Sequence, residues 1–132
     1  MNMITRKNFL LLTIALILTV CILVGAIIFL RYRNPKVNSF EFSDYQHYVD
    51  EFPLDKNVGA IIDAKDATKK AETVWIEIYG KAVTKQKPYE VFYDAANKVW
   101  LVKGTVGFQR KGGVAHILMN NTGDVLAVWH TK

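Results

Sequence analysis

Three histidines, one cysteine and scattered carboxylates are the side chains of this sequence that could support catalysis or bind a metal. His47, His116 and His130 lie far apart along the chain, and Cys21 lies within an apolar run. No HExxH motif, cysteine cluster or paired-carboxylate spacing accompanies them, and no serine sits in an elbow motif. The sequence therefore predicts no metal site, no cofactor and no catalytic set.

The strands that would position two of these histidines are indicated by apolar residues that alternate after Pro88. Four strands are predicted, over residues 89–94, 98–105, 114–120 and 125–131. Pairing Asp94 with Val99 in the first hairpin places Glu90 opposite Lys103, a favourable cross-strand pair. One face of this hairpin then consists of Tyr, Val and Trp side chains, and we expect it to pack against a helix.

The second hairpin determines whether its histidines can act together. Pairing Asn120 with Val125 places His116 opposite Trp129 and puts His130 one position further along. Successive side chains of a strand point to opposite faces, so in this register the two histidines cannot share a metal or a proton relay.

Two helices are predicted between the apolar run and the strands. The first follows a capping-box pattern at Ser43–Gln46 and ends at Pro53; its apolar face consists of Tyr45, Tyr48, Val49 and Phe52. The second extends over 64–79, with Asp63 or Asp66 as its cap and Gly80 as its stop. Its apolar stripe consists of Ala67, Ala71, Val74, Trp75 and Ile78.

The run Phe9–Leu30 has the composition of a membrane-spanning helix. It contains no charged residue, no Asn, no Gln and no Pro, and sixteen of its residues are Leu, Ile, Phe or Val. A helix of this length is roughly 33 Å long, enough to cross a hydrocarbon core of about 30 Å. A cleaved signal peptide is disfavoured because its apolar region is usually shorter, and lipidation of Cys21 is disfavoured because Val20 precedes it.

The formal net charge of +5 is concentrated beside this run. Five of the 17 basic residues flank it, and the remaining 12 equal the 12 acidic residues; the five are Arg6, Lys7, Arg31, Arg33 and Lys36. The charge thus indicates headgroup contacts rather than a nucleic-acid partner. We expect a single-pass membrane protein and favour a domain on the exported side.

The composition predicts four regions along the chain. They are an N-terminal tail (1–8), a transmembrane helix (9–30), a polar linker (31–39) and one α+β domain (40–132).

Short motifs in the second half of the chain occur in a distinctive order. They read IYGK, KQKP, WLVKGT, GGV and HTK, and their marker residues are Gly80, Lys87, Pro88, Trp100, Gly104, Gly112, Gly113 and His130. This order resembles the nuclear-transport-factor-2-like fold immunity proteins of bacterial toxin–immunity systems. The resemblance implies helices packed on a curved antiparallel β-sheet, a structural role for the marker residues, and a non-catalytic protein that binds and neutralises a cognate toxin.

The glycine-bounded loop 107–113 is the predicted toxin interface. It presents an aromatic side chain and two cations in the stretch Phe108, Gln109, Arg110 and Lys111, a combination that suits recognition. Two alternative functions stay open. One is a membrane-associated domain that binds an envelope partner or itself, and the other is a small-molecule isomerase or dehydratase using Tyr93, Asp94 and His116.

Overall fold

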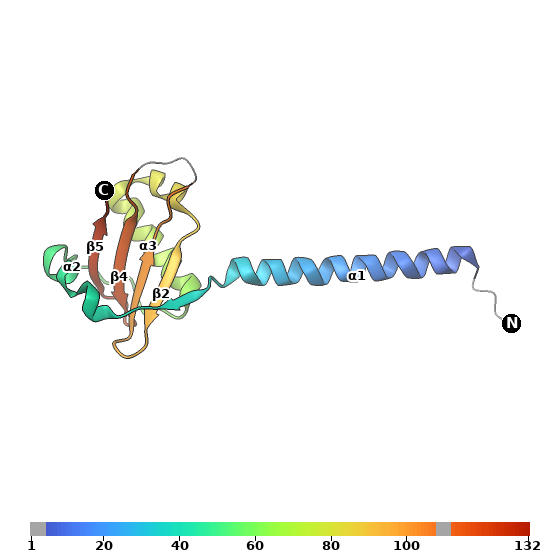
Figure 1. The fold of residues 1–132 in the computed structure, drawn as a ribbon, viewed down its shortest axis with the longest axis horizontal. Helices are drawn as coiled ribbons and strands as arrows, with labels where there is room; N and C mark the ends of the chain where they lie inside the picture. The colour runs from blue at the N-terminus through green and yellow to red at the C-terminus, as the bar shows by residue number, and fades with distance from the viewer. Residues whose placement is uncertain (1–4, 108–111) are drawn as a thin grey trace. The chain divides into compact units, whose positions relative to one another are not determined.

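The computed structural model describes residues 5–107 and 112–132. The chain divides into two units, Met1–Asn34 and Pro35–Lys132. Its elements (Figure 1) are α1 (Arg6–Arg33), β1 (Val37–Ser39), the 3-10 helix η1 (Phe42–Tyr45), α2 (Gln46–Glu51), α3 (Ala64–Tyr79), the 3-10 helix η2 (Lys81–Gln86), β2 (Glu90–Asp94), β3 (Val99–Lys103), β4 (Ala115–Asn120) and β5 (Val125–His130).

Helix α1 contains the predicted membrane-spanning run and extends beyond it at both ends. Among the described residues it is the one helix long and apolar enough to cross a membrane, with a mean hydropathy of 3.0. The hydroxyls of its two threonines, Thr13 and Thr19, donate to carbonyl groups one turn earlier, at 2.9 Å each. A signal sequence near an N-terminus has the same properties.

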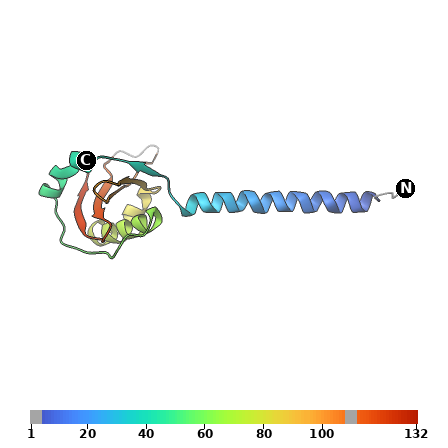
Figure 2. The same cartoon turned by 90° about the horizontal axis from the view of Figure 1, so that it is seen from below.

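The second unit is built on a five-stranded curved sheet in the order β1-β2-β3-β4-β5 (Figure 2). Strand β1 lies within the predicted linker and runs parallel to β2, with Val37 opposite Val91 and Ser39 opposite Tyr93. The other neighbours are antiparallel, as predicted. A three-residue strand is too short to show an alternating pattern, so the sequence does not predict β1.

The first hairpin has the predicted register. Asp94 pairs with Val99, and the Lys103 ammonium lies 3.3 Å from a carboxylate oxygen of Glu90. In the second hairpin His116 lies opposite Trp129, also as predicted.

The predicted pairing of Asn120 with Val125 at the second turn is wrong. Val125 pairs with Met119, and a bulge in β5 leaves Leu126 without a partner. The extra residue places both Leu126 and Ala127 on one face of the sheet.

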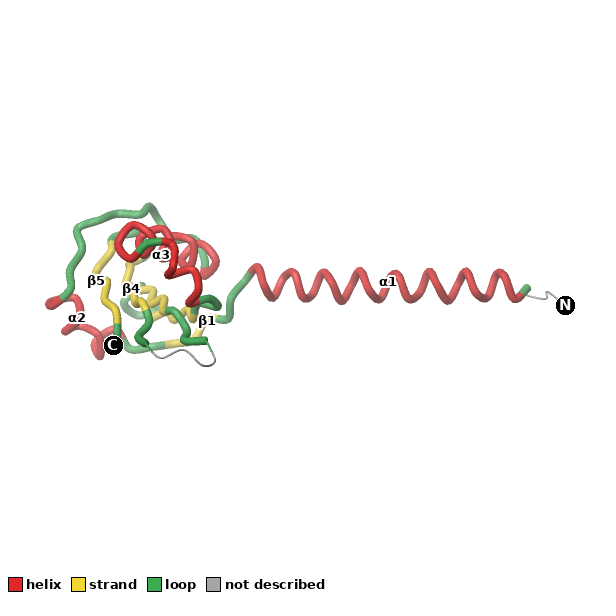
Figure 3. Tube along the Cα trace, turned by 90° about the horizontal axis from the view of Figure 1, so that it is seen from above, coloured by secondary structure: helices red, strands yellow, loops and turns green. Residues whose placement is uncertain are grey.

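Helix α3 covers one face of the sheet (Figure 3). It has the predicted bounds, and the Asp63 side chain caps it by accepting a hydrogen bond from the Asp66 N–H at 2.8 Å. Its buried residues are Ala64, Ala67, Ala71, Val74 and Trp75. They pack on Tyr89, which precedes β2, and on Val91, Tyr93, Trp100 and Val102 of the strands. Only the end of the predicted stripe is wrong, because Ile78 is 47% exposed.

An aromatic segment, residues 40–52, covers the other face. Its rings join Leu101, Leu118 and Trp129 in a second core. The predicted capping box does not form; the Phe42 N–H instead donates to Asp94 Oδ2 at 2.9 Å. The chain then runs along β5, where the Val128 N–H donates to the Phe52 carbonyl (3.2 Å) and the Val125 N–H to the Lys56 carbonyl (2.8 Å).

Candidate interaction surfaces

One end of the sheet gathers most of the residues singled out by the sequence motifs. Glu90, Lys103 and His116 lie side by side on adjacent strands, and Val37 begins β1 next to them. We call this the entry end, because the chain enters the sheet here. It comprises Lys36, η2 with Lys87 and Pro88, the ends of β3 and β5, and the start of β4.

Gln86 holds the entry end together. Its carbonyl accepts the Thr105 N–H, and its side-chain Oε1 accepts the Ala115 N–H, at 2.8 Å each. A Cβ at Gly104 would overlap the Gln86 side chain, so glycine is needed there. Gln86 belongs to the KQKP motif but is not one of the eight marker residues. No local pattern could have identified it, because its partners are 19 and 29 residues away.

Three marker glycines lie at the same end. Gly80, with φ 84°, ends α3, and Gly112 also has a positive φ of 144°. A Cβ at Gly113 would overlap the Thr131 carbonyl, where the last strand passes. Backbone conformation and close packing thus account for glycine at these positions.

Three further marker residues flank the glycines. The Lys87 ammonium lies 3.0 Å from a Glu72 carboxylate oxygen, and Pro88 accepts a hydrogen bond from Thr105 Oγ1 at 3.0 Å. The His130 ring lies 5.5 Å from the ring of Tyr79 at the end of α3. These contacts connect the three residues to α3 and to the chain after β3; the structural role that the resemblance implies for them stays a prediction.

The marker Trp100 lies towards the opposite end of the sheet. Its indole Nε1 donates to Asn121 Oδ1 at 2.8 Å, and the amide of Asn121 donates to the Tyr93 hydroxyl at 3.0 Å. Tyr93 therefore belongs to a hydrogen-bonded network beside the second turn.

The other two residues of the enzyme alternative do not join Tyr93. Asp94 is the last residue of β2, next to the first turn. Hydrogen bonds from the Asn97 side chain and from the N–H groups of Phe42 and Asn97 lower its pKa to about 2. His116 pairs with Lys103 at the entry end. The structure thus separates Asp94 and His116 by the length of the sheet.

His116 has a structural environment. Its Nδ1 donates to the Val114 carbonyl at 3.0 Å, and its ring stacks on Trp129 with centroids 4.9 Å apart. Burial lowers the pKa of its imidazole, and the nearby Lys103 charge lowers it further. No group of three His, Cys, Asp or Glu side chains that could hold a metal occurs in residues 5–107 and 112–132.

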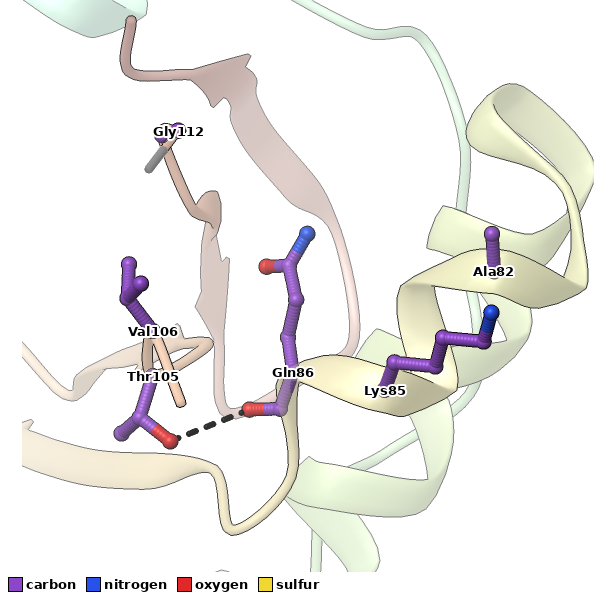
Figure 4. A pocket seen from close by; sticks show the side chains of 7 residues that line it. Ala82, Lys85, Gln86, Thr105, Val106 and Gly112 are labelled. Atoms are coloured by element: carbon purple, nitrogen blue, oxygen red, sulfur yellow. Dashed lines mark hydrogen bonds between the residues drawn. The ribbon is translucent and has the colours of Figure 1, made fainter. Parts of the chain in front are cut away.

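A small open pocket of about 160 Å³ lies at the entry end (Figure 4). The Gln86 side chain stands between Thr105 and Val106 on one side and Ala82 and Lys85 on the other. The predicted toxin-interface residues Phe108, Gln109, Arg110 and Lys111 lie outside the described residues. The chain on both sides of them, at Val106 and Gly112, lines this pocket.

Charge is distributed unevenly over the second unit. The entry-end lysines are Lys36, Lys81, Lys85, Lys87 and Lys103. The carboxylates beside them, Glu72 and Glu90, are each in an ion pair with one of these lysines. In contrast, residues 41–55 contain no Lys or Arg and present five exposed carboxylates, of Glu41, Asp44, Asp50, Glu51 and Asp55.

A family model described as an NTF2 fold immunity protein matches residues 66–132, from the first turn of α3 through β5. The match includes all eight marker residues and leaves out β1, η1 and α2. Neither a curated protein nor a solved structure matches the chain. With half of its residues covered, including four strands of the sheet, the chain belongs to the family of NTF2 fold immunity proteins.

Proposed function

We propose that this protein is a membrane-tethered immunity protein that binds a cognate toxin and blocks it without catalysis. The observation that carries the proposal is the family match over 66–132. Helix α1 supplies the tether, and residues 35–132 supply the binding domain. Tethering keeps the binder at high effective concentration in the bacterial inner membrane, with the domain on the exported side, where an incoming toxin first arrives.

The loop that carries Phe108, Gln109, Arg110 and Lys111 remains our proposed toxin interface. The described residues beside it support this choice. Val106 is 47% exposed and lines the pocket beside which the chain continues into the loop. An exposed apolar side chain next to the loop cations Arg110 and Lys111 suits a partner that presents apolar and acidic groups.

Genetics and capture test the toxin-binding part. Deletion of the gene should sensitise cells to a toxin encoded beside it, and tagged protein in detergent extracts should capture that toxin. Capture of an envelope component instead would favour the assembly alternative. Conversion of a small molecule by the purified protein, lost in Asp94→Asn, would favour the enzyme.

A pair of charge reversals tests the interface. Arg110→Glu combined with Lys111→Glu should weaken toxin capture, whereas Lys69→Glu combined with Lys98→Glu, at two exposed positions elsewhere, should leave it unchanged. Undiminished capture by the loop variant would refute the interface but not the function.

Fractionation tests the tether. The intact chain should sediment with membranes after ultracentrifugation, resist alkaline extraction and keep its N-terminal mass. A soluble product that lacks α1 would identify a signal sequence instead. A compartment-sensitive reporter fused at Lys132 then reports the side of the membrane on which the domain lies.

A further inference from the structure

We propose that the entry-end lysines bind the anionic headgroups of the membrane that holds α1. The inference rests on the proposed tether and adds a second, electrostatic contact to it. The occupant of this surface is a phospholipid bilayer rich in negatively charged lipids, not an acidic protein.

The short connection between the two units limits where this surface can be. Helix α1 ends at Arg33 and β1 begins at Val37, so three residues join them. At about 3.6 Å per residue, this connection spans at most roughly 14 Å, whatever the orientation of the domain. Val37 therefore stays close to the headgroups next to the end of α1.

The register of the sheet brings the lysines near Val37. Lys36 precedes β1, and the neighbouring strands carry Glu90 and Lys103 at adjacent positions. Adjacent strands are about 4.8 Å apart, so Lys103 lies two strand spacings from the chain entry. Lys87 lies beside the start of β2, and Gln86 joins η2, with Lys81 and Lys85, to the end of β3.

The charges at this end favour an anionic surface. Five lysines face two carboxylates, Glu72 and Glu90, each of which is paired with a lysine. Lys36, Lys81 and Lys85 have no ion pair among the described residues and are exposed. Attraction to an anionic bilayer decays over a Debye length of about 10 Å, so it acts on groups held near the lipid.

The acidic stretch 41–55 reinforces the same orientation. The Phe42 N–H is bound to Asp94, which lies at the end of β2 away from the chain entry. The rest of the stretch runs along β5, and Tyr48 stacks on Trp129 near the end of that strand. Strand β5 is the edge strand furthest from β1, so these carboxylates are separated from Lys36 across the sheet. Repulsion from anionic lipid therefore disfavours contact at the β5 edge and favours contact at the lysines near β1.

Lysine acetylation of the full chain in nanodiscs tests the inference. Discs of phosphatidylglycerol and of phosphatidylcholine are compared, and the reaction rate of each lysine is read by peptide mass spectrometry. Lys36, Lys81 and Lys85 should react severalfold more slowly in the anionic discs, and molar salt should remove the difference. Lys69 and Lys98, exposed elsewhere on the domain, should react equally in both.

A charge-reversal pair sharpens the test. Lys81→Glu with Lys85→Glu should abolish the lipid-dependent protection of the entry-end lysines Lys87 and Lys103, whereas Lys69→Glu with Lys98→Glu should retain it. Equal rates in the two kinds of disc for the inserted wild-type chain would overturn the inference and leave the tether standing. Failure to insert into any disc would defeat the tether, and protection that appears only when toxin is added would assign the lysines to the toxin.

Discussion

The two faces of the sheet are covered in different ways. On one face, a capped sixteen-residue helix buries Trp75 completely against strands that the family match includes. On the other, a 3-10 turn and a six-residue helix from outside the match lay aromatic rings on Trp129. The helix that covers the first face lies almost wholly within the family match, whereas the segment that covers the second face lies outside it.

The difference in construction implies a difference in stability. Helix α3 has a side-chain cap and a long buried stripe, whereas no side-chain cap bond holds α2. A helix of six residues is not stable alone and depends on its packing. We therefore expect the segment 40–52 to open locally before the α3 face unfolds.

Truncation of one aromatic side chain on each face gives the largest expected effect. Trp75→Ala leaves a cavity in a fully buried site and should cost about 3–5 kcal/mol of unfolding free energy. Tyr48→Ala removes a half-buried ring that stacks on Trp129 at 4.0 Å and should cost about 1–2 kcal/mol. Urea denaturation in detergent measures both. Equal costs would contradict the ranking of the faces.

A glycine substitution tests the close packing of strand ends in residues 66–132, the part of the chain that the family model matches. Gly113→Ala places a methyl group against the Thr131 carbonyl and should cost about 2–3 kcal/mol. Gly107→Ala is the matched control, because nothing lies within 4 Å of its added Cβ, and it should change the stability by less than about 1 kcal/mol. Equal melting temperatures for the two variants would show that Gly113 does not lie in close contact with the Thr131 carbonyl.

Acid should release the aromatic segment. The pKa of Asp94 is lowered from its usual 3.8 to about 2 by the Asn97 side chain and by backbone N–H groups that include Phe42. The folded pKa lies below the unfolded one, so the carboxylate stabilises the fold fully above about pH 4, and this contribution is lost as the pH falls through about 2. The protection factor of the Phe42 amide, which is the ratio of its intrinsic to its observed exchange rate by NMR, should fall in this window.

Asp94→Asn provides the control for the acid experiment. The side-chain amide does not titrate, so the protection factor of the Phe42 amide should be lower at neutral pH and should not fall further as the pH drops below 4. An unchanged pH dependence would show that another carboxylate controls the segment.

The smallest effect on stability is expected from Trp129→Phe. The buried Trp129 Nε1 has no hydrogen-bond partner among the described residues, whereas Trp75 donates to the His116 carbonyl and Trp100 to Asn121. Trp129→Phe removes an unpaired donor as well as apolar area, so its unfolding free energy should change by less than about 1 kcal/mol. Trp100→Phe should cost more unfolding free energy. Urea denaturation measures both variants, and a larger cost for Trp129→Phe than for Trp100→Phe would show that the Trp129 Nε1 has a hydrogen-bond partner.

Much of the fold from α3 to β3 could be predicted because its signals are local in the sequence. Asp63 and Gly80 mark the ends of α3, and the short turn between Asp94 and Val99 sets the register of the first hairpin. The second face could not be predicted in the same way. The Phe42 N–H finds its acceptor 52 residues away, so Ser43 was mistaken for a capping residue.

The entry end shows the same limit. The sequence motifs marked its glycines, but the role of Gln86 depends on strands that lie far along the chain. The lysines there were not grouped from the sequence, because only the parallel pairing of β1 with β2 brings Lys36 beside Glu90 and Lys103.

The backbone bonds along β5 have a consequence for encounters between copies of the chain. An open strand edge allows two copies to join edge to edge. The carbonyls of Phe52 and Lys56 occupy the outward N–H groups of Val128 and Val125, and the opposite edge is only three residues long. Two copies that meet therefore find little free backbone at these edges with which to pair.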